Sequence, residues 1–444
     1  MKPDEKWVSK FSNVLPSPFS IAVILTFLAF LLAFIFTEND SFTLINYWRS
    51  GFWNNGLLVF LVQMMLMLVL GHALALTPTF SKITNIIVLR CNSTASAAYW
   101  VSLSAIVISL LNWGLGLIFG AILARKAGGY AKQKQLKINY PLIGAAGYSG
   151  LMVWHGGFSG SAPLKVAESG HFLENSIGII GLNQTLFSPL NLLVTSLVIL
   201  IIPTFFFVIG KKVKPKAYSF ESNHEGSSEI KEEKLGAEKM DGYQWFSVMM
   251  GLFLLFAVLN ESIQSEVSIY NLITPNFINL ILFGLCLCLH QNTGSFLNAV
   301  NKAIVGSSGI LIQFPIYFGI MGVMNSSGLI SDFSTFLVSV SNETSFPLLT
   351  FVSAGVVNIF IPSGGGQWAV QGSLIAETSQ QLGIPIGKSI MAMAYGDQLT
   401  NMLQPFWALP LLGITQLKGK EILPYSFLIM LIGTAIFTIG LLVF

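Results

Sequence analysis

A short segment in the last third of the chain combines a helix break with polar side chains. Between Asn358 and Gly372, one proline and three consecutive glycines interrupt a run of apolar residues. A helix that begins after such a break presents amide N–H groups without partners, and its dipole favours an anion there. A kink for close helix packing is the alternative interpretation. We predict an anion-binding site made by Ser363, Gly364, Gly365, Gly366, Gln367 and Trp368.

A second break of the same kind lies between Asn112 and Gly116, inside the apolar stretch 97–124. Its glycines permit a non-helical turn, and it carries fewer polar groups than the first break. We predict Asn112 as a coordinating side chain and Gly114 as the residue that allows the turn. Close packing of two helices is again the alternative.

An acidic residue marks a third candidate segment, between Tyr395 and Pro405. Asp397 is the only carboxylate in this apolar stretch, and acids inside a membrane are costly and usually functional. Because glycine and proline bracket the segment, it can unwind and expose carbonyl oxygens. Two interpretations stay open besides a cation site: Asp397 carries a proton, or it caps a helix near the membrane surface. The oxygens of a Na⁺ site would come from Asp397, Thr400, Asn401 and Gln404.

The fourth candidate segment runs from Tyr148 to Ser161 and contains His155. Four glycines and three serines in so short a stretch predict an unwound helix. A histidine there can hydrogen-bond a carboxylate or carry a proton near neutral pH. The alternative is a histidine that merely satisfies its own hydrogen bonds.

These segments belong to a chain that is too apolar for a water-soluble protein. It has 444 residues, of which 53% are hydrophobic and 10% charged, whereas soluble domains carry about 25% charged residues. We therefore predict an all-α polytopic membrane protein, surrounded by lipid, and exclude collagen, disordered polymers and secreted disulfide scaffolds. The net charge of +3 gives no reason to expect nucleic acid as a partner.

Motifs of enzymes and of ATP-driven pumps are missing from the sequence. It contains neither a phosphate-binding Walker loop nor the H-E-x-x-H or G-x-S-x-G motifs. The three cysteines have no metal-ligand spacing. We expect no enzyme activity, no cofactor and no metal beyond Na⁺ at Asp397 and Asn401; a membrane acyltransferase that uses His155 is the remote alternative.

Charge-free runs mark about nine transmembrane helices. The stretches 97–124 and 345–376 are each too long for one crossing and break in the middle, so we predict two re-entrant hairpins. The nine spans are about 18–37, 56–76, 141–161, 189–210, 243–259, 276–289, 303–324, 389–414 and 422–444.

The basic residues favour this topology. With the amino terminus inside and both hairpins re-entrant, all 23 Lys and Arg residues except Arg49, Lys165 and Lys388 fall on one side. If either hairpin crossed the membrane once, every later loop would change sides and the asymmetry would collapse. The positive-inside rule therefore predicts a cytoplasmic amino terminus.

Counting the spans divides the chain into two halves of opposite orientation. The first repeat is 1–210, with an inside-entering hairpin near 97–124; a cytoplasmic linker, 211–242, and a connector helix, 243–260, follow. The second, inverted repeat is 261–444, with an outside-entering hairpin near 345–376. Inverted repeats with broken helices at matching positions are typical of transporters.

Three of these motifs resemble the bacterial short-chain fatty acid transporter family of the acetoacetate and butyrate uptake type. They are the segments 357–372, 152–164 and 396–407. The resemblance extends over essentially the whole chain. It implies membership of the ion-transporter superfamily, with two re-entrant hairpins, two unwound helices and commonly a homodimer.

The resemblance also implies a secondary active transporter in the bacterial inner membrane. We expect a short-chain carboxylate between the hairpin tips, walled by Trp154, Trp368 and Phe406, with H⁺ or Na⁺ coupling through Asp397, Asn401 and His155. A transporter of the same architecture for a dicarboxylate or another organic anion is the nearest alternative. The dicarboxylate is disfavoured because, apart from histidines, no basic residue lies well inside a span. A passive facilitator remains open.

Overall fold

Helices make up nearly all of the structure. The computed structural model describes residues 18–216, 240, 242–264, 272–360 and 363–444, and their only β contact is an isolated bridge between Asn139 and Lys216. The prediction of an all-α protein is therefore confirmed. The first seventeen residues and most of the predicted linker, 217–239 and 241, lie outside the described part.

The first half of the chain contributes the helices up to α11. Its α-helices are α2 (Pro18–Phe36), α3 (Ser41–Phe52), α4 (Asn55–Ala75), α5 (Pro78–Val88), α6 (Thr94–Leu111), α7 (Trp113–Gln133), α8 (Tyr140–Tyr148), α9 (Ser161–Lys165), α10 (Glu174–Ile177) and α11 (Pro189–Lys212).

The second half contributes the remaining helices. They are α12 (Gln244–Gln264), α14 (Pro275–Leu289), α15 (Thr293–Ile304), α16 (Ser308–Ser326), α17 (Leu329–Val340), α18 (Ser345–Phe360), α19 (Gly364–Gln381), α20 (Ile386–Thr400), α21 (Pro405–Thr415) and α22 (Gly419–Val443).

Six described helices are long and apolar enough to cross a membrane: α4, α6, α11, α12, α16 and α22. Shorter apolar helices occupy Ala22–Phe36, Pro275–Leu289 and Ser345–Ile359. Large apolar side chains point outward, among them Phe27 (70% exposed) and Phe253 (63% exposed), as expected where lipid replaces water. The chain is a multi-pass membrane protein. Helix α6, which we predict as a hairpin arm, is also long enough to span.

Each interrupted stretch forms two helices that contact each other across a break. Helices α6 and α7 are separated by the single residue Asn112, whose backbone is extended (φ −159°, ψ 128°). Helices α18 and α19 contact each other, and Ser363, also extended (φ −163°, ψ 112°), caps α19. Residues 361–362, including the proline of the motif, lie outside the described part.

Two further segments unwind near the middle of the molecule. Helix α8 ends at Tyr148 and continues as short 3₁₀ turns, Ser149–Met152 and Trp154–Gly156, before α9. Helix α20 ends at Thr400 and continues as the 3₁₀ turn Asn401–Leu403 before α21. The Tyr148 hydroxyl donates to the carbonyls of Asn401 (2.7 Å) and Gln404 (3.2 Å). The two unwound segments therefore contact each other.

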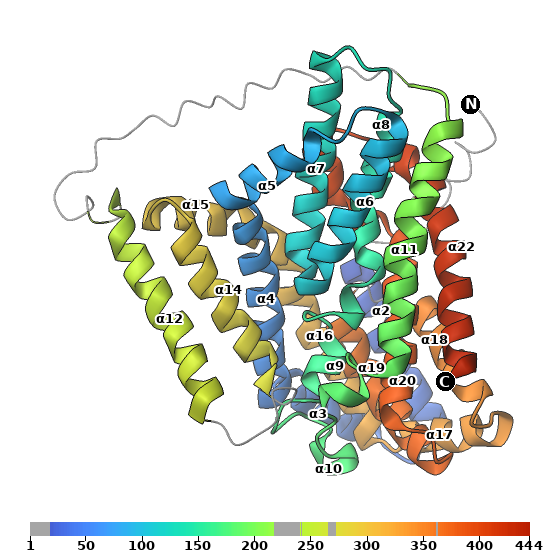
Figure 1. The fold of residues 1–444 in the computed structure, drawn as a ribbon. Coiled ribbons are helices and arrows are strands. Elements are labelled where there is room, and N and C mark those ends of the chain that lie inside the picture. The colour runs from blue at the N-terminus through green and yellow to red at the C-terminus, as the bar shows by residue number, and fades with distance from the viewer. Residues whose placement is uncertain (1–17, 217–239, 241, 265–271, 361–362) are drawn as a thin grey trace.

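The helices form a central group with flanks on two sides (Figure 1). Helices α12 and α14 pack together, and α14 contacts α4. On the other side, α11 contacts α6 and α22. Helices α4, α7 and α16 lie between these flanks.

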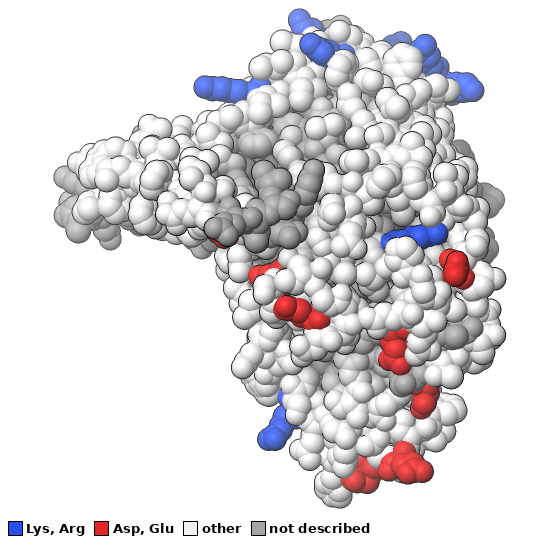
Figure 2. Space-filling view, turned by 60° about the horizontal axis from the view of Figure 1, so that its bottom comes forward, with Lys and Arg blue, Asp and Glu red and all other residues white. Residues whose placement is uncertain are grey.

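Charge is distributed unequally between the two ends of the molecule. Lys126 of α7 donates to Ser81 (3.0 Å) and Thr84 (2.8 Å) of α5, and Lys216, which follows α11, pairs with Glu421 of α22 at 2.8 Å. In Figure 1 these segments lie toward the same end of the molecule, at the top of the view. Acidic residues lie on or beside α3, α10 and α17 at the opposite end (Figures 1 and 2): Asp40, Glu174 and Asp332.

Candidate functional site

A cavity lies where the two helix breaks and the two unwound segments come together. The cavity is small in this structure, because only about 20 Å³ of it is open to the centre of a water-sized molecule. Its lining combines apolar and aromatic side chains with three polar ones. The residues are Met64, Trp113, Leu151, Trp154, Ser161, Ile310, Phe314, Ser363, Gly364, Gly365, Asn401 and Trp407.

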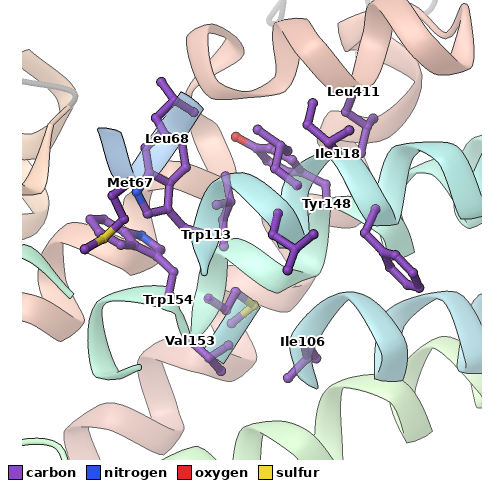
Figure 3. Close-up of a cluster of buried hydrophobic side chains, with 14 of the residues drawn as sticks. Met67, Leu68, Ile106, Trp113, Ile118, Tyr148, Val153, Trp154 and Leu411 are labelled. Carbon is purple, nitrogen blue, oxygen red and sulfur yellow. The ribbon is translucent and has the colours of Figure 1, made fainter. Parts of the chain in front are cut away.

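Indole rings form one wall of the cavity. The ring centroid of Trp113 lies 6.0 Å from that of Trp154 and 5.0 Å from that of Trp407. Figure 3 shows Trp113 and Trp154 beside one another among buried apolar side chains. No Lys or Arg occurs among the described lining residues. The wall is therefore suited to a short apolar group rather than to a second negative charge.

The amino-terminal turn of α19 opens onto this cavity. The Ser363 hydroxyl accepts the Gly366 amide N–H at 3.1 Å, so the amides of Gly364 and Gly365 are the ones that lack a partner within the helix. A Cβ on Gly364 would lie 2.7 Å from the Trp154 ring and 2.8 Å from His155 Cε1. Only glycine leaves the backbone exposed at this close approach.

The corresponding turn of α7 is closed by its neighbours. The Asn112 side chain accepts the Leu115 amide at 2.8 Å and donates to the Met67 carbonyl at 3.0 Å. The Trp113 amide donates to the Ser159 hydroxyl at 2.9 Å. A Cβ on Gly114 would lie 3.0 Å from the Leu68 carbonyl oxygen. At this tip Asn112 and Gly114 support packing, and only the Trp113 side chain reaches the cavity lining.

A buried histidine–aspartate pair lies next to the open turn. His155 Nδ1 and Asp397 Oδ2 are 2.8 Å apart, and neither side chain is more than 1% exposed. The Ala162 amide N–H donates to His155 Nε2 at 3.2 Å. Because Nε2 accepts, a neutral imidazole carries its proton on Nδ1 and donates it to Asp397. The pair thus holds His155 as a neutral donor to the carboxylate.

Asp397 keeps one oxygen available. Its Oδ1 is buried and has no hydrogen-bond partner among the described residues, while a Cβ on Gly364 would lie 3.2 Å from Oδ2. The carboxylate therefore adjoins the first turn of α19. An unpartnered buried carboxylate oxygen is costly, which makes it a natural acceptor for a proton or a cation.

More oxygens than donors gather around Asn358. Its Nδ2 lies 2.6 Å from the Asp397 carbonyl, 2.8 Å from Asn401 Oδ1 and 3.0 Å from Thr400 Oγ1, yet an amide nitrogen has only two hydrogens. Gln404 Nε2 donates to the Asn358 carbonyl. In the described part, Oδ1 of Asn358 and Oε1 of Gln404 have no partner. Such an excess of neutral oxygens suits a hard cation such as Na⁺.

Two other predicted binding residues lie away from the cavity. Gln367 is fully buried and donates to the Ala354 carbonyl (2.9 Å) and to Gln371 (2.8 Å). Trp368 is buried in an apolar cluster with Ala354 and Ile390. The side chain of Phe406 lies outside the described residues. Of the second break, Ser363, Gly364 and Gly365 therefore line the cavity, and Gly366 is capped.

Sequence reasoning missed three side chains that support the site. Asn358 is the centre of the oxygen cluster, and Gln398 Oε1 accepts the His155 amide at 3.1 Å. Lys165 is 3% exposed, although the charge count places it outside as a loop residue. The polar residue Asn358 inside an apolar helix was the available signal for the first of these.

Solved structures with the same fold define the class. The YdaH transporter of Alcanivorax borkumensis aligns with a TM-score of 0.58 at 15% identity, over 96% of this chain and 98% of that chain. MtrF of Neisseria gonorrhoeae, described in terms of antimetabolite efflux pumps, aligns with a TM-score of 0.54 at 15% identity, over 98% and 97%. The chain has the fold of membrane transporters.

Sequence similarity makes the assignment narrower. The family model for short chain fatty acid transporters matches residues 4–444. A relative from Escherichia coli K12 is 34% identical over 99% of both chains, and one from Haemophilus influenzae is 35% identical over 97% of this chain and 96% of its own. Both are named as candidate short-chain fatty acid transporters. The chain belongs to the short-chain fatty acid transporter family, whose members are transporters and not enzymes.

Proposed function

We propose that this protein is a secondary active transporter that moves short-chain monocarboxylates, such as butyrate and acetoacetate, across the bacterial inner membrane. The observation that carries the proposal is the open turn of α19, which faces an aromatic cavity and adjoins Asp397. This arrangement combines an anion-binding tip, an apolar pocket and a group able to bind a coupling ion.

The chemistry of the cavity supports a short monocarboxylate. Its carboxylate would accept from the amides of Gly364 and Gly365 and from the Ser363 hydroxyl, at the positive end of the α19 dipole. The short acyl chain would pack against the indoles of Trp113 and Trp154. A dicarboxylate would need a second cationic or donor group, and the described lining offers no Lys or Arg for it.

The coupling ion would act at Asp397. If the ion is H⁺, it goes to the unpartnered Oδ1, because Nε2 of His155 already accepts the Ala162 amide. If it is Na⁺, the oxygens of Asp397, Thr400, Asn401 and Gln404 hold it, together with Asn358. Neutralising the carboxylate beside the open turn lowers the repulsion that an anionic substrate would meet there, which links the two binding events.

The membrane arrangement belongs to the same proposal. The end of the molecule that holds Lys126 and Lys216 faces the cytoplasm under the positive-inside rule. Then α6–α7 and α18–α19 are re-entrant hairpins of an inverted repeat, and alternating access arises when one group of helices moves against the other. We expect a homodimer, as for the superfamily that the sequence resembles.

Uptake into proteoliposomes tests this function. Labelled butyrate and acetoacetate are offered under an imposed pH gradient or Na⁺ gradient, with empty liposomes as the control for passage of the neutral acid. Accumulation above equilibrium under one gradient identifies secondary transport and the ion. Saturable exchange without accumulation would indicate a passive facilitator, and movement of neither acid would contradict the substrate class.

Asp397→Asn tests the coupling role separately. Loss of the carboxylate should reduce gradient-driven accumulation to the equilibrium ratio of about one, while exchange of substrate on both sides continues, because coupling and substrate binding are distinct free energies. Counterflow of labelled substrate is the internal control. Undiminished accumulation by Asp397→Asn would remove this residue from the coupling role.

A further inference from the structure

Away from the cavity, the carboxylate of Glu168 is bound by other side chains of the protein. Lys165 is the one buried Lys or Arg in the described part of the chain, at 3% exposure. Its ammonium lies 2.6 Å from Glu168 Oε2 and 3.4 Å from Gln63 Oε1. A buried ammonium is tolerated only when it is paired and hydrogen-bonded, so Glu168 is its essential counter-ion.

The other carboxylate oxygen of Glu168 also accepts hydrogen bonds. Gln63 Nε2 donates to Glu168 Oε1 at 2.8 Å, and Asn276 Nδ2 donates to the same oxygen at 3.2 Å. These donors come from three helices: Lys165 from α9, Gln63 from α4 and Asn276 from α14. The Glu168 side chain itself is 14% exposed, and it belongs to the segment that follows α9.

The donors also contact one another and the neighbouring helices. Gln63 is fixed through its backbone carbonyl, which accepts from Asn279 at 2.9 Å, and its Nε2 also lies 3.0 Å from Asn276 Oδ1. Lys165 lies over the Phe60 ring, 5.6 Å from its centroid. These contacts do not involve Glu168, so they remain available if a free carboxylate replaces its side chain as the partner of Lys165.

The chemical identity of the bound group suggests what else would fit. Beyond its Cα, a glutamate side chain is a carboxylate on two methylenes, that is, a propionate attached to the chain. We propose that Lys165, Gln63 and Asn276 form a second binding site for short-chain monocarboxylates, which Glu168 occupies in this structure and leaves when a free carboxylate arrives. The choice of this ligand class rests on the proposed function.

The second site lies one aromatic ring from the cavity. The Phe60 ring that covers Lys165 is also 3.0 Å from where a Cβ on Gly365 would lie. Phe60 neighbours Phe314 of the cavity lining, with centroids 6.4 Å apart. Glu168 is partly exposed and lies between α9 and α10, toward the acidic end in Figure 1. The site therefore holds a carboxylate between that end and the cavity.

Chemical rescue of Glu168→Ala tests the site. The purified variant is titrated with sodium propionate against sodium chloride at constant pH and ionic strength, and its thermal unfolding is followed. We expect propionate to raise the unfolding temperature of Glu168→Ala by more than that of the wild type. Equal shifts in the two proteins would overturn the proposal. The double variant Glu168→Ala/Lys165→Met is the matched control, and it should lose the additional shift.

The cavity must be separated from the second site in this experiment. Glu168→Ala is therefore also made together with Gly364→Ala, which disturbs the open turn of α19. If the additional shift persists there, propionate binds at Lys165; if it vanishes, the shift belongs to the cavity and the proposal fails. The second site can hold even if labelled butyrate is not transported, so its failure and that of the transport function are distinguishable.

A conservative variant covers the case in which Glu168→Ala does not fold. In Glu168→Gln the amide keeps the size of the side chain but competes less strongly for the Lys165 ammonium than a carboxylate does. Propionate should again stabilise this variant more than the wild type. Stabilisation no greater than that of the wild type would overturn the proposal.

Discussion

The two helix breaks are built alike but end in different environments. Both begin a helix with an extended capping residue, Asn112 for α7 and Ser363 for α19. At the α7 tip, the Ser159 hydroxyl and the Met67 carbonyl take up the polar groups. At the α19 tip, the backbone of Gly364 and Gly365 lines the cavity. One break is therefore closed by protein groups, and at the other we propose that the backbone donates to a ligand.

Glycine serves a different purpose at each tip. A Cβ on Gly116 would overlap the Ser109 hydroxyl of the opposing arm, so this glycine lets α6 and α7 approach. A Cβ on Gly364 would instead meet Trp154 and His155 around the cavity. A similar sequence pattern thus brings two helix arms together in one half and brings the backbone against the cavity-lining aromatic rings in the other. The difference comes from which neighbours each tip has.

The largest expected effect concerns Asp397, whose carboxylate adjoins the α19 tip and has no counterpart at the α7 tip. His155→Leu removes the donor to Asp397 and leaves a buried carboxylate without a partner, which costs about 3–5 kcal/mol unless it stays protonated. His155→Asn keeps an N–H donor near the position of Nδ1. We expect Leu to abolish gradient-driven uptake and Asn to retain part of it, as measured by accumulation in proteoliposomes. Equal losses in the two variants would count against the donor role.

A matched pair of glycine variants should separate the tips. Gly116→Ala overpacks the closed tip and should lower the free energy of unfolding by about 1–3 kcal/mol, with little change in KM of the folded protein. Gly364→Ala should mainly raise KM, because the cavity wall must shift. Thermal unfolding and the concentration dependence of uptake measure the two effects. A similar profile for both variants would contradict the distinction between the tips.

The smallest expected effects come from the capping residues. Asn112→Ala loses the cap of α7 and should cost about 1–2 kcal/mol of stability without weakening substrate binding. Ser363→Ala loses a hydroxyl that lines the cavity, and we expect KM to rise roughly tenfold, which corresponds to about 1.4 kcal/mol. The concentration dependence of uptake by folded protein gives KM for both variants, and calorimetry gives the matching substrate affinity. A rise in KM for Asn112→Ala would place the first tip in the binding site after all.

Local sequence was sufficient to predict where the helices break. Glycine, proline and polar residues in apolar runs mark Asn112, Ser363 and both unwound segments, because these residue types act on the backbone at their own position. The all-α membrane fold followed from composition. For His155, the sequence indicated only that it can hydrogen-bond a carboxylate; it did not identify Asp397 as that partner.

Properties that depend on distant partners could not be predicted. Nothing near Asn112 in the sequence indicates that Ser159 and Met67 close its tip, and nothing near Trp368 indicates that it packs into an apolar cluster. The charge count places Lys165 on the outer side, and nothing in the local sequence indicates that Gln63 and Asn276, from other helices, bind its counter-ion. Tertiary neighbours decided these three cases.

The wall of indoles described above has an optical consequence. Of the nine tryptophans in the chain, three line one small cavity: Trp113, Trp154 and Trp407. Trp154 also stacks on His155, with centroids 4.5 Å apart. The protein thus contains a native fluorophore cluster at the cavity, and we expect its emission to report, without a label, what enters there.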